Sequence, residues 1–191
     1  MKQLSLFIIA AFALTQFTHC SNQFSSNQAD TVITDTSCWV GPGLYQIPED
    51  KTGDSIRYGR ALISQTAYYL GPRGKVRQIS NGMNCQNCHL DAGTKPWGNN
   101  FGRVQANYPL FRARSGTMET IRKRISDCFE RSLNGTAPDS GSYEMEAMVA
   151  YIRWVGKEVP ANTTPRGTGI RELTYMQRAA RSTSMTWTVG M

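Results

Sequence analysis

Two cysteines and a histidine stand together as Cys85-Gln-Asn-Cys88-His89, a spacing that can hold a haem. In this Cys-x-x-Cys-His pattern each thiol adds to one vinyl group of the haem, and the histidine then ligates the iron. A zinc half-site and a thioredoxin-like dithiol are the alternatives. The first needs a second Cys/His pair and the second needs a βαβ unit, and the sequence offers neither pattern. The motif therefore predicts one covalent haem c.

The ligand on the other side of the iron is narrowed by the scarcity of histidine. The sequence has two histidines, His19 and His89, and His19 lies in an N-terminal segment with the pattern of a cleaved export signal. Ligation by two histidines is then excluded, which leaves methionine, cysteine, lysine, water or an open position. Met145 and Met148 are methionine candidates, although core packing is the commoner role of such residues.

Cys128 is the sharper candidate for the sixth ligand. Cationic neighbours lower the pKa of a thiol and favour the thiolate. Those of Cys128 are Arg122, Lys123, Arg124 and Arg131. A disulfide with Cys38 and a buried free thiol are the alternatives. We therefore expect His89 and Cys128 to be the two protein ligands of the iron.

The first twenty residues resemble an export signal. Lys2 provides the positive start, and residues 4–14 are nearly all apolar yet too few to span a bilayer. Cys20 follows where a bacterial lipoprotein signal places its lipidated cysteine, which predicts membrane attachment; a soluble exported protein is the alternative. Either ending predicts a location in the periplasm or elsewhere outside the cytoplasmic membrane.

Composition narrows the class of protein. Of the 191 residues, 40% are hydrophobic and 18% are charged, which supports a folded core. No apolar run of 18 or more residues is present, so a polytopic membrane protein is excluded. The formal net charge of +7 favours an anionic ligand or partner but is too small to indicate nucleic acid.

The elements that must position the motif are helical. Three helices are predicted, at 54–70, 117–134 and 142–155, with apolar residues at helical spacing and a glycine after each. Met118, Ile121, Ile125 and Cys128 share one stripe of the second helix. The first and third helices are expected to pack together near Gly59, Tyr151 and Trp154. The fold class is thus mainly α, a cytochrome c-like domain of three or more helices around one covalent haem.

The domain organisation follows from composition. Residues 1–20 are the export signal, 21–52 a flexible tether and irregular lead-in, 53–160 the cytochrome c domain and 161–191 a C-terminal extension. Within the domain, residues 71–115 show little periodicity and are predicted to be a loop that other elements hold in place.

Four blocks of this domain carry a family resemblance. They are 81–96 around the haem motif, 108–115, 127–135 and 144–154. In content and order they resemble the thiosulfate dehydrogenases and the related SoxA-type sulfur-oxidising cytochromes. The resemblance covers about residues 54–160.

The resemblance implies specific roles for four residues. Cys128 would be the distal haem ligand and the sulfur-handling residue, whereas Arg114, Arg124 and Ser132 would hold an anionic sulfur substrate. An arginine fork suits a sulfur oxyanion. From the residues alone, haem propionate pairing or a solvated surface explains the two arginines equally well, and a solvated surface is preferred for Arg122 and Lys123.

The C-terminal extension departs from the family pattern. Family members generally continue into a second haem domain, but here the resemblance fades after 167–173, and 177–180 matches only the beginning of such a domain. One interpretation of 161–191 is the truncated start of that domain.

The expected function is electron transfer by an exported c-type cytochrome with a redox partner protein. The alternative is an oxidoreductase, or a subunit of one, that oxidises thiosulfate or a related reduced sulfur compound at a cysteine-ligated haem.

Overall fold

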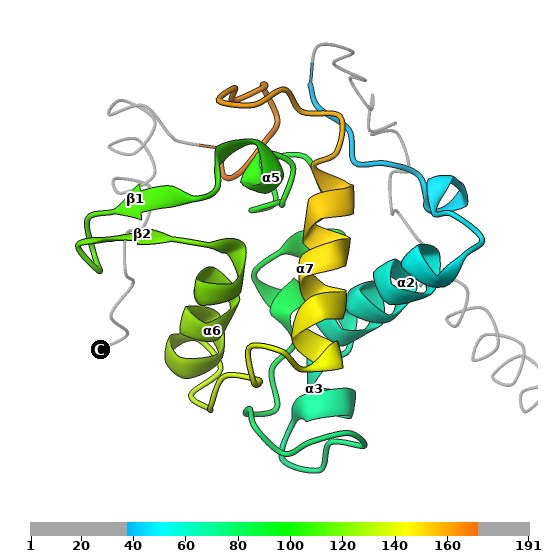
Figure 1. The fold of residues 1–191 in the computed structure, drawn as a ribbon, viewed down its shortest axis with the longest axis vertical. Helices are drawn as coiled ribbons and strands as arrows, with labels where there is room; N and C mark the ends of the chain where they lie inside the picture. Colours follow the sequence, from blue (N-terminus) through cyan, green and yellow to red (C-terminus); the bar gives the residue numbers. More distant parts are fainter. Residues whose placement is uncertain (1–37, 172–191) are drawn as a thin grey trace, which may run out of the picture. The chain divides into compact units, whose positions relative to one another are not determined.

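The computed structural model describes residues 38–171, which are mainly helical (Figure 1). The elements are η1 (Leu44–Gln46), α2 (Lys51–Ser64), α3 (Thr66–Leu70), η2 (Cys85–Asn87), α4 (Leu90–Gly93), α5 (Val104–Asn107), β1 (Leu110–Arg112), β2 (Thr117–Glu119), α6 (Ile121–Arg131) and α7 (Tyr143–Val155). The mainly α prediction is confirmed. No helix within these residues is both long and apolar enough to cross a membrane.

The core of the described domain forms where α2 packs against α7 (Figure 1). A Cβ atom at Gly59 of α2 would lie 1.9 Å from the carbonyl oxygen of Ala147 and 2.9 Å from Cβ of Tyr151. Only a residue without a side chain allows two backbones to approach this closely. The predicted contact between Gly59 and Tyr151 is therefore confirmed.

The predicted third helix is confirmed with its boundaries. Ser142 caps it, because its hydroxyl oxygen accepts a hydrogen bond of 3.3 Å from the backbone N–H of Met145. The apolar stripe of α7 is buried. Its members are Met145, Met148, Ile152 and Val155.

The predicted first helix is displaced and broken. Asp50, rather than Asp54, caps α2 by accepting a hydrogen bond of 2.9 Å from the N–H of Gly53. The helix is interrupted at Gln65, whose φ of −129° and ψ of 43° are not helical, so that α3 follows as a separate turn. Both aspartates were chemically able to cap, and the sequence could not decide between them.

The predicted second helix, 117–134, starts before the observed helix α6. Its first residues form the strand β2 instead. β1 and β2 form an antiparallel hairpin in which Phe111 pairs with Met118. The chain reverses through Gly116, whose φ of +68° suits glycine. Thr120 then caps α6. Met118 is 60% exposed and so does not belong to the predicted apolar stripe.

Residues 161–171, predicted as the start of the extension, pack back onto the loop that follows the haem motif. The side-chain N–H₂ of Asn100 donates to the carbonyl oxygen of Gly167 at 2.7 Å, and its Oδ1 accepts from the N–H of Gly169 at 3.0 Å. Gly98 and Ile170 form an isolated β-bridge. The remaining predictions for 1–37 and 172–191, including the one for Cys20, lie outside the described residues.

Candidate functional site

The Cys-x-x-Cys segment is tied to the junction between α2 and α3. Thr66 Oγ1 accepts a hydrogen bond of 3.0 Å from the N–H of Cys85 and lies 3.2 Å from its sulfur. Asn84 Oδ1 accepts a second hydrogen bond, of 2.8 Å, from the N–H of Ala67. Burial raises the pKa of the Cys85 thiol to about 11. Cys88, by contrast, is exposed at the edge of the segment.

His89 is oriented as a metal-ligating histidine would be. Its Nδ1 lies 2.6 Å from the carbonyl oxygen of Asn99, which identifies Nδ1 as the N–H donor and leaves the lone pair on Nε2. The ring also packs 4.6 Å from the ring of Phe101. Burial lowers the pKa of His89 and so favours the neutral imidazole, the form that binds iron.

The turn after His89 is held in an uncommon backbone conformation. Asp91, Ala92 and Gly93 have φ values of 53°, 53° and 84°. A Cβ atom at Gly93 would lie 2.2 Å from the ring of Phe101, so the ring packs where a side chain would otherwise stand. Such strain persists only when the surroundings fix it.

A cavity of about 540 Å³ lies between the motif and α6. Cys85, Cys88 and His89 line one part of it, and Cys128 of α6 also lines it. Its apolar wall consists of Ile63, Phe101, Val104, Leu110, Ile121, Ile125, Phe129, Leu133, Met148, Ile152 and Ile170. A largely apolar pocket of this volume with a few convergent polar groups is typical of a cofactor site.

Three polar residues of α6 and its C-terminal cap line the cavity at a spacing of four residues. They are Arg124, Cys128 and Ser132, and residues four apart lie one above the other on a helix face. Arg124 is close enough to act electrostatically on both Cys128 and His89.

Comparison with known proteins places this domain in a family. Residues 75–161 match the family model described as the SoxA/TsdA cytochrome c domain. These residues are a SoxA/TsdA-type cytochrome c domain. Its cofactor is covalently bound haem c, which the thiols of Cys85 and Cys88, the free Nε2 of His89 and the apolar cavity all fit.

The similar proteins described here are all thiosulfate dehydrogenases. The chain is 36% identical over 128 residues to the thiosulfate dehydrogenase of Psychrobacter arcticus, a match that covers 67% of this chain and 38% of that protein. It is 34% identical over 137 residues to the thiosulfate dehydrogenase of Allochromatium vinosum, covering 70% and 49%. The solved structure of thiosulfate dehydrogenase TsdBA from Marichromatium purpuratum matches with a TM-score of 0.65 and 26% identity, covering 72% and 30%. The chain thus spans less than half the length of these relatives.

Within residues 38–171 of this SoxA/TsdA-type domain, Cys128 forms no disulfide. The alternative disulfide between Cys128 and Cys38 is therefore not formed. Burial raises the pKa of the Cys128 thiol, and this outweighs the opposing effect of Arg124. Arg124 lowers this pKa, as predicted for a cationic neighbour, but desolvation of the thiol exceeds that attraction and the net shift is upward. A thiolate at this position would therefore need a bound cation such as iron to favour loss of the thiol proton.

Arg114 does not reach the cavity that the family resemblance assigned to it. It is exposed in the turn of the β1–β2 hairpin and is not among the cavity-lining residues. Arg112 of β1 lines the cavity instead. The sequence reasoning missed Arg112 because the family resemblance gave the anion-binding role to Arg114; a hairpin turn ending at Gly116 was the signal that could have drawn attention to Arg112.

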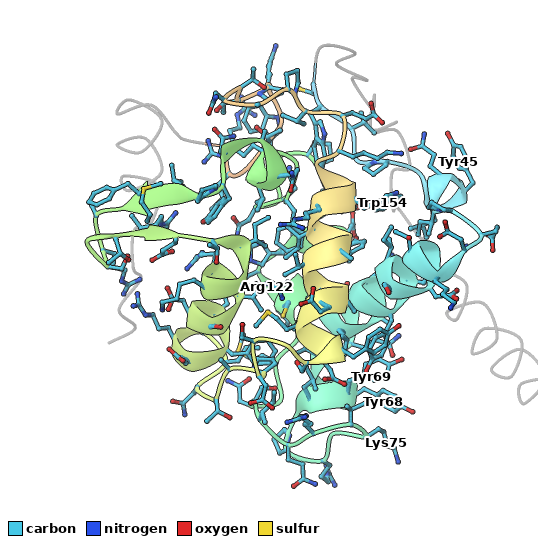
Figure 2. All side chains as sticks on the ribbon, viewed as in Figure 1. Tyr45, Tyr68, Tyr69, Lys75, Arg122 and Trp154 are labelled. Carbon is cyan, nitrogen blue, oxygen red and sulfur yellow. The ribbon has the colours of Figure 1, made fainter. Side chains whose placement is uncertain are left out.

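The remaining candidate residues also divide into those that line the cavity and those that do not. Met148 lines the cavity, whereas Met145 does not. Arg122 pairs with Glu146 of α7 and Lys123 with Asp127, and neither cation lines the cavity. Figure 2 shows Arg122 between α6 and α7. Sequence reasoning also missed seven further polar or sulfur-bearing lining residues, which are Met83, Asn84, Asn99, Asn100, Arg103, Asn107 and Tyr108.

Proposed function

We propose that this domain oxidises thiosulfate, or a closely related reduced sulfur compound, at a single haem c ligated by His89 and Cys128. The observation that carries the proposal is that Arg124, Cys128 and Ser132 line the same cavity as the haem motif at successive turns of one helix face. The names of the similar proteins support thiosulfate as the substrate class.

Each of the three residues has a role that fits a sulfur oxyanion. The guanidinium of Arg124 donates hydrogen bonds to the oxyanion end of the substrate. The hydroxyl of Ser132 donates one more, and the sulfur of Cys128 meets the outer sulfur of the substrate. Haem c supplies one-electron oxidation beside that sulfur.

The overall reaction joins two thiosulfates through a new S–S bond to give tetrathionate and releases two electrons and no proton. One haem accepts one electron at a time. The two electrons therefore leave in succession to a redox partner, for which another haem protein is the fitting chemical class.

The test is the reduction of the ferric holoprotein by thiosulfate, followed by the haem spectrum without any added acceptor. We expect wild type to be reduced and Arg124→Gln to react at least tenfold more slowly, because it loses a charge-assisted contact. Arg122→Gln is the matched control: it removes the same charge from the same helix but outside the cavity. Wild-type haem that thiosulfate leaves oxidised, or equal rates for the two variants, contradicts the proposal.

We further propose that the domain works outside the cytoplasmic membrane and is held there through lipidated Cys20. The support is the export pattern of 1–20 and the fact that haem c is attached outside the bacterial cytoplasm. The intact mass of the purified protein checks this. It should exceed that of residues 20–191 plus haem by a lipid increment, and a mass that starts after Cys20 would rule out the anchor.

A further inference from the structure

A basic loop, residues 71–77, follows α3 at one end of the described domain (Figure 1). Figure 2 shows Tyr68, Tyr69 and Lys75 together at this end, whereas Trp154 lies towards the other end of α7. In the sequence, residues 55–90 contain five Lys or Arg and no Asp or Glu. The loop therefore belongs to a stretch of chain with an excess of positive charge.

The backbone of the basic loop is held against α3. The N–H of Lys75 donates to the carbonyl oxygen of Tyr68 at 2.9 Å, and the N–H of Val76 donates to that of Tyr69 at 3.0 Å. A Cβ atom at Gly74 would lie 2.1 Å from a backbone carbonyl oxygen of the same loop, so only glycine allows the chain to turn this tightly. The loop thus presents its side chains from a fixed backbone.

Two cations of the basic loop have no partner in the described part of the chain. Arg73 and Lys75 are exposed, and within residues 38–171 neither side chain makes a hydrogen bond or an ion pair. Arg77 differs, because its guanidinium lies 3.2 Å from Asp139 Oδ2 in an exposed pair. The uncompensated charge of this surface therefore comes from Arg73 and Lys75.

Exposed apolar groups stand next to these cations. Tyr68 is 54% exposed and Val76 is 42% exposed, and Pro72 is exposed as well. The ring of Tyr68 packs edge-on against Tyr69, with ring centroids 4.9 Å apart. Tyrosine combines an apolar ring with a polar hydroxyl, and it is enriched where a membrane meets water. The loop and Tyr68 thus combine cations with amphipathic and apolar groups on one small surface.

We propose that the basic loop and Tyr68 form a membrane-docking face that binds an anionic phospholipid bilayer. Arg73 and Lys75 contact lipid phosphates, and Tyr68 and Val76 enter the headgroup layer. The positive face is complementary to the negative bilayer. A single turn is also a small surface for a protein partner, since a stable interface buries about 800 Å² on each side. The inference goes beyond sulfur oxidation and requires neither that activity nor a lipid on Cys20.

Docking at this face fixes the haem motif relative to the bilayer. The N-terminal residue of α3 is Thr66, whose Oγ1 accepts the hydrogen bond from the N–H of Cys85. The basic loop begins directly after the other end of α3, which has only five residues. The loop and the motif are thus joined by one short helix. A redox partner held in the same membrane then meets the domain in one orientation.

The test is cosedimentation of the full-length holoprotein with lipid vesicles. The protein carries Cys20→Ser, so that no acyl chain at residue 20 contributes to binding. Vesicles of phosphatidylglycerol and phosphatidylcholine in equal parts are compared with vesicles of phosphatidylcholine alone. We expect binding to the anionic vesicles to be at least about fivefold stronger, and to be lost in about 0.5 M NaCl because salt screens exposed charges.

A double variant tests the two cations. Arg73→Gln with Lys75→Gln should weaken binding to the anionic vesicles about tenfold, because both contacts with lipid phosphates are lost. Arg153→Gln with Lys157→Gln is the matched control and should stay within about twofold. It removes the same number of exposed charges beside Trp154, at the other end of α7.

Tyr68→Ser tests the apolar contribution without a change of charge. It should weaken binding about threefold, because the ring no longer enters the headgroup layer. Tyr45→Ser is its control, since Tyr45 is 88% exposed and lies well away from Tyr68 in Figure 2. The haem absorption spectrum of every variant confirms that the domain is loaded and folded.

Equal binding to both kinds of vesicle, or equal losses in the two double variants, overturns the inference. Binding that millimolar inorganic phosphate competes away at constant ionic strength also overturns it, because the loop then recognises a free anion. Absence of binding to anionic vesicles does the same. If the Arg73→Gln, Lys75→Gln protein then also passes electrons more slowly to an acidic redox protein, the face belongs to a protein partner instead.

Discussion

The phenol of Tyr151 donates a hydrogen bond of 3.0 Å to the backbone carbonyl oxygen of Ala92. Tyr151 is fully buried in the middle of α7, and Ala92 belongs to the left-handed turn just after His89. Burial raises the pKa of Tyr151 to about 12, so the phenol stays a donor well above neutral pH. The core helix therefore fixes the turn that follows the haem histidine.

Tyr151→Phe should destabilise the holoprotein by roughly 1–3 kcal/mol, because it leaves the buried carbonyl of Ala92 without its donor. Tyr143→Phe is the control on the same helix: Tyr143 is 55% exposed, and its loss should cost less than about 0.5 kcal/mol. Denaturant unfolding of the two variants checks the difference. Equal midpoints would show that the hydrogen bond does not support the turn.

Gly59→Ala should disrupt the packing of α2 on α7. Its new methyl group would lie 1.9 Å from the Ala147 carbonyl oxygen, so the helices must move apart, and we expect a loss above about 3 kcal/mol. Gly82→Ala is the control, since no atom lies within 4 Å of a Cβ there. Thermal unfolding distinguishes them, and a Gly59→Ala protein as stable as Gly82→Ala would refute the close approach.

The helix pairing was readable from the sequence because two local signals agreed. α7 has apolar residues at helical spacing, a Ser142 cap and Gly156 at its end, and Gly59 marks a close approach in α2. For α2, the sequence predicted the type of capping residue but not its position. Asp50 and Asp54 offer the same chemistry, and tertiary contacts decide between them.

The hairpin and the turn after His89 could not be predicted from the sequence. Strands of three residues are too short to show alternation, so β1 was taken for loop and β2 for the start of a helix. Which arginine of this segment lines the cavity depends on that hairpin, and the family resemblance, which named Arg114, did not indicate Arg112. Asp91 and Ala92 carry no signal for a positive φ, because the contacts of Phe101 and Tyr151 impose it.

Cys128 is predicted to be the sixth iron ligand. A thiolate stabilises ferric iron, so Cys128→Met should raise the reduction potential. Low-temperature electron paramagnetic resonance of the ferric protein should give a low-spin thiolate-type signal that vanishes in Cys128→Ala. Met148→Ala should keep the signal and lose roughly 2–5 kcal/mol of packing. A signal that survives Cys128→Ala would assign the ligand elsewhere.

One haem is predicted per chain, attached through Cys85 and Cys88. A pyridine haemochrome assay should give one thioether-linked haem per protein. Cys88→Ala should leave the haem with one thioether, which shifts the haemochrome band to longer wavelength. Haem that extracts into acidic acetone from the wild type would contradict covalent attachment.

The ion pair between Arg122 and Glu146 should make stability depend on pH. Arg122 Nη2 lies 2.6 Å from Glu146 Oε1, and this hydrogen bond holds the pKa of Glu146 below its usual value. A lowered folded-state pKa gives stability that is complete above the unfolded pKa of about 4.3 and is lost as the pH falls through the folded value. Both side chains are more than one third exposed, so the contribution is a few tenths of a kcal/mol.

Arg122→Gln should therefore be slightly less stable than wild type at pH 7 and equal to it near pH 3, as followed by denaturant unfolding at several pH values. In the Glu146→Gln background the same substitution should show no such dependence. A difference that persists unchanged at pH 3 would mean that Arg122 acts by packing alone.

The cavity between the motif and α6 also bears on biogenesis. Side chains from α2, α6 and α7 share it, so a chain without the cofactor would leave apolar groups of three core helices facing water. Cys85 already packs against the core and is hydrogen-bonded through Thr66 in the folded domain. Attachment chemistry must then reach the cysteines before the chain collapses. Haem delivery and folding are thereby ordered in time. A chain with both cysteines replaced by alanine should be recovered as protease-sensitive, unfolded polypeptide. A protease-resistant apoprotein would show that folding does not wait for haem.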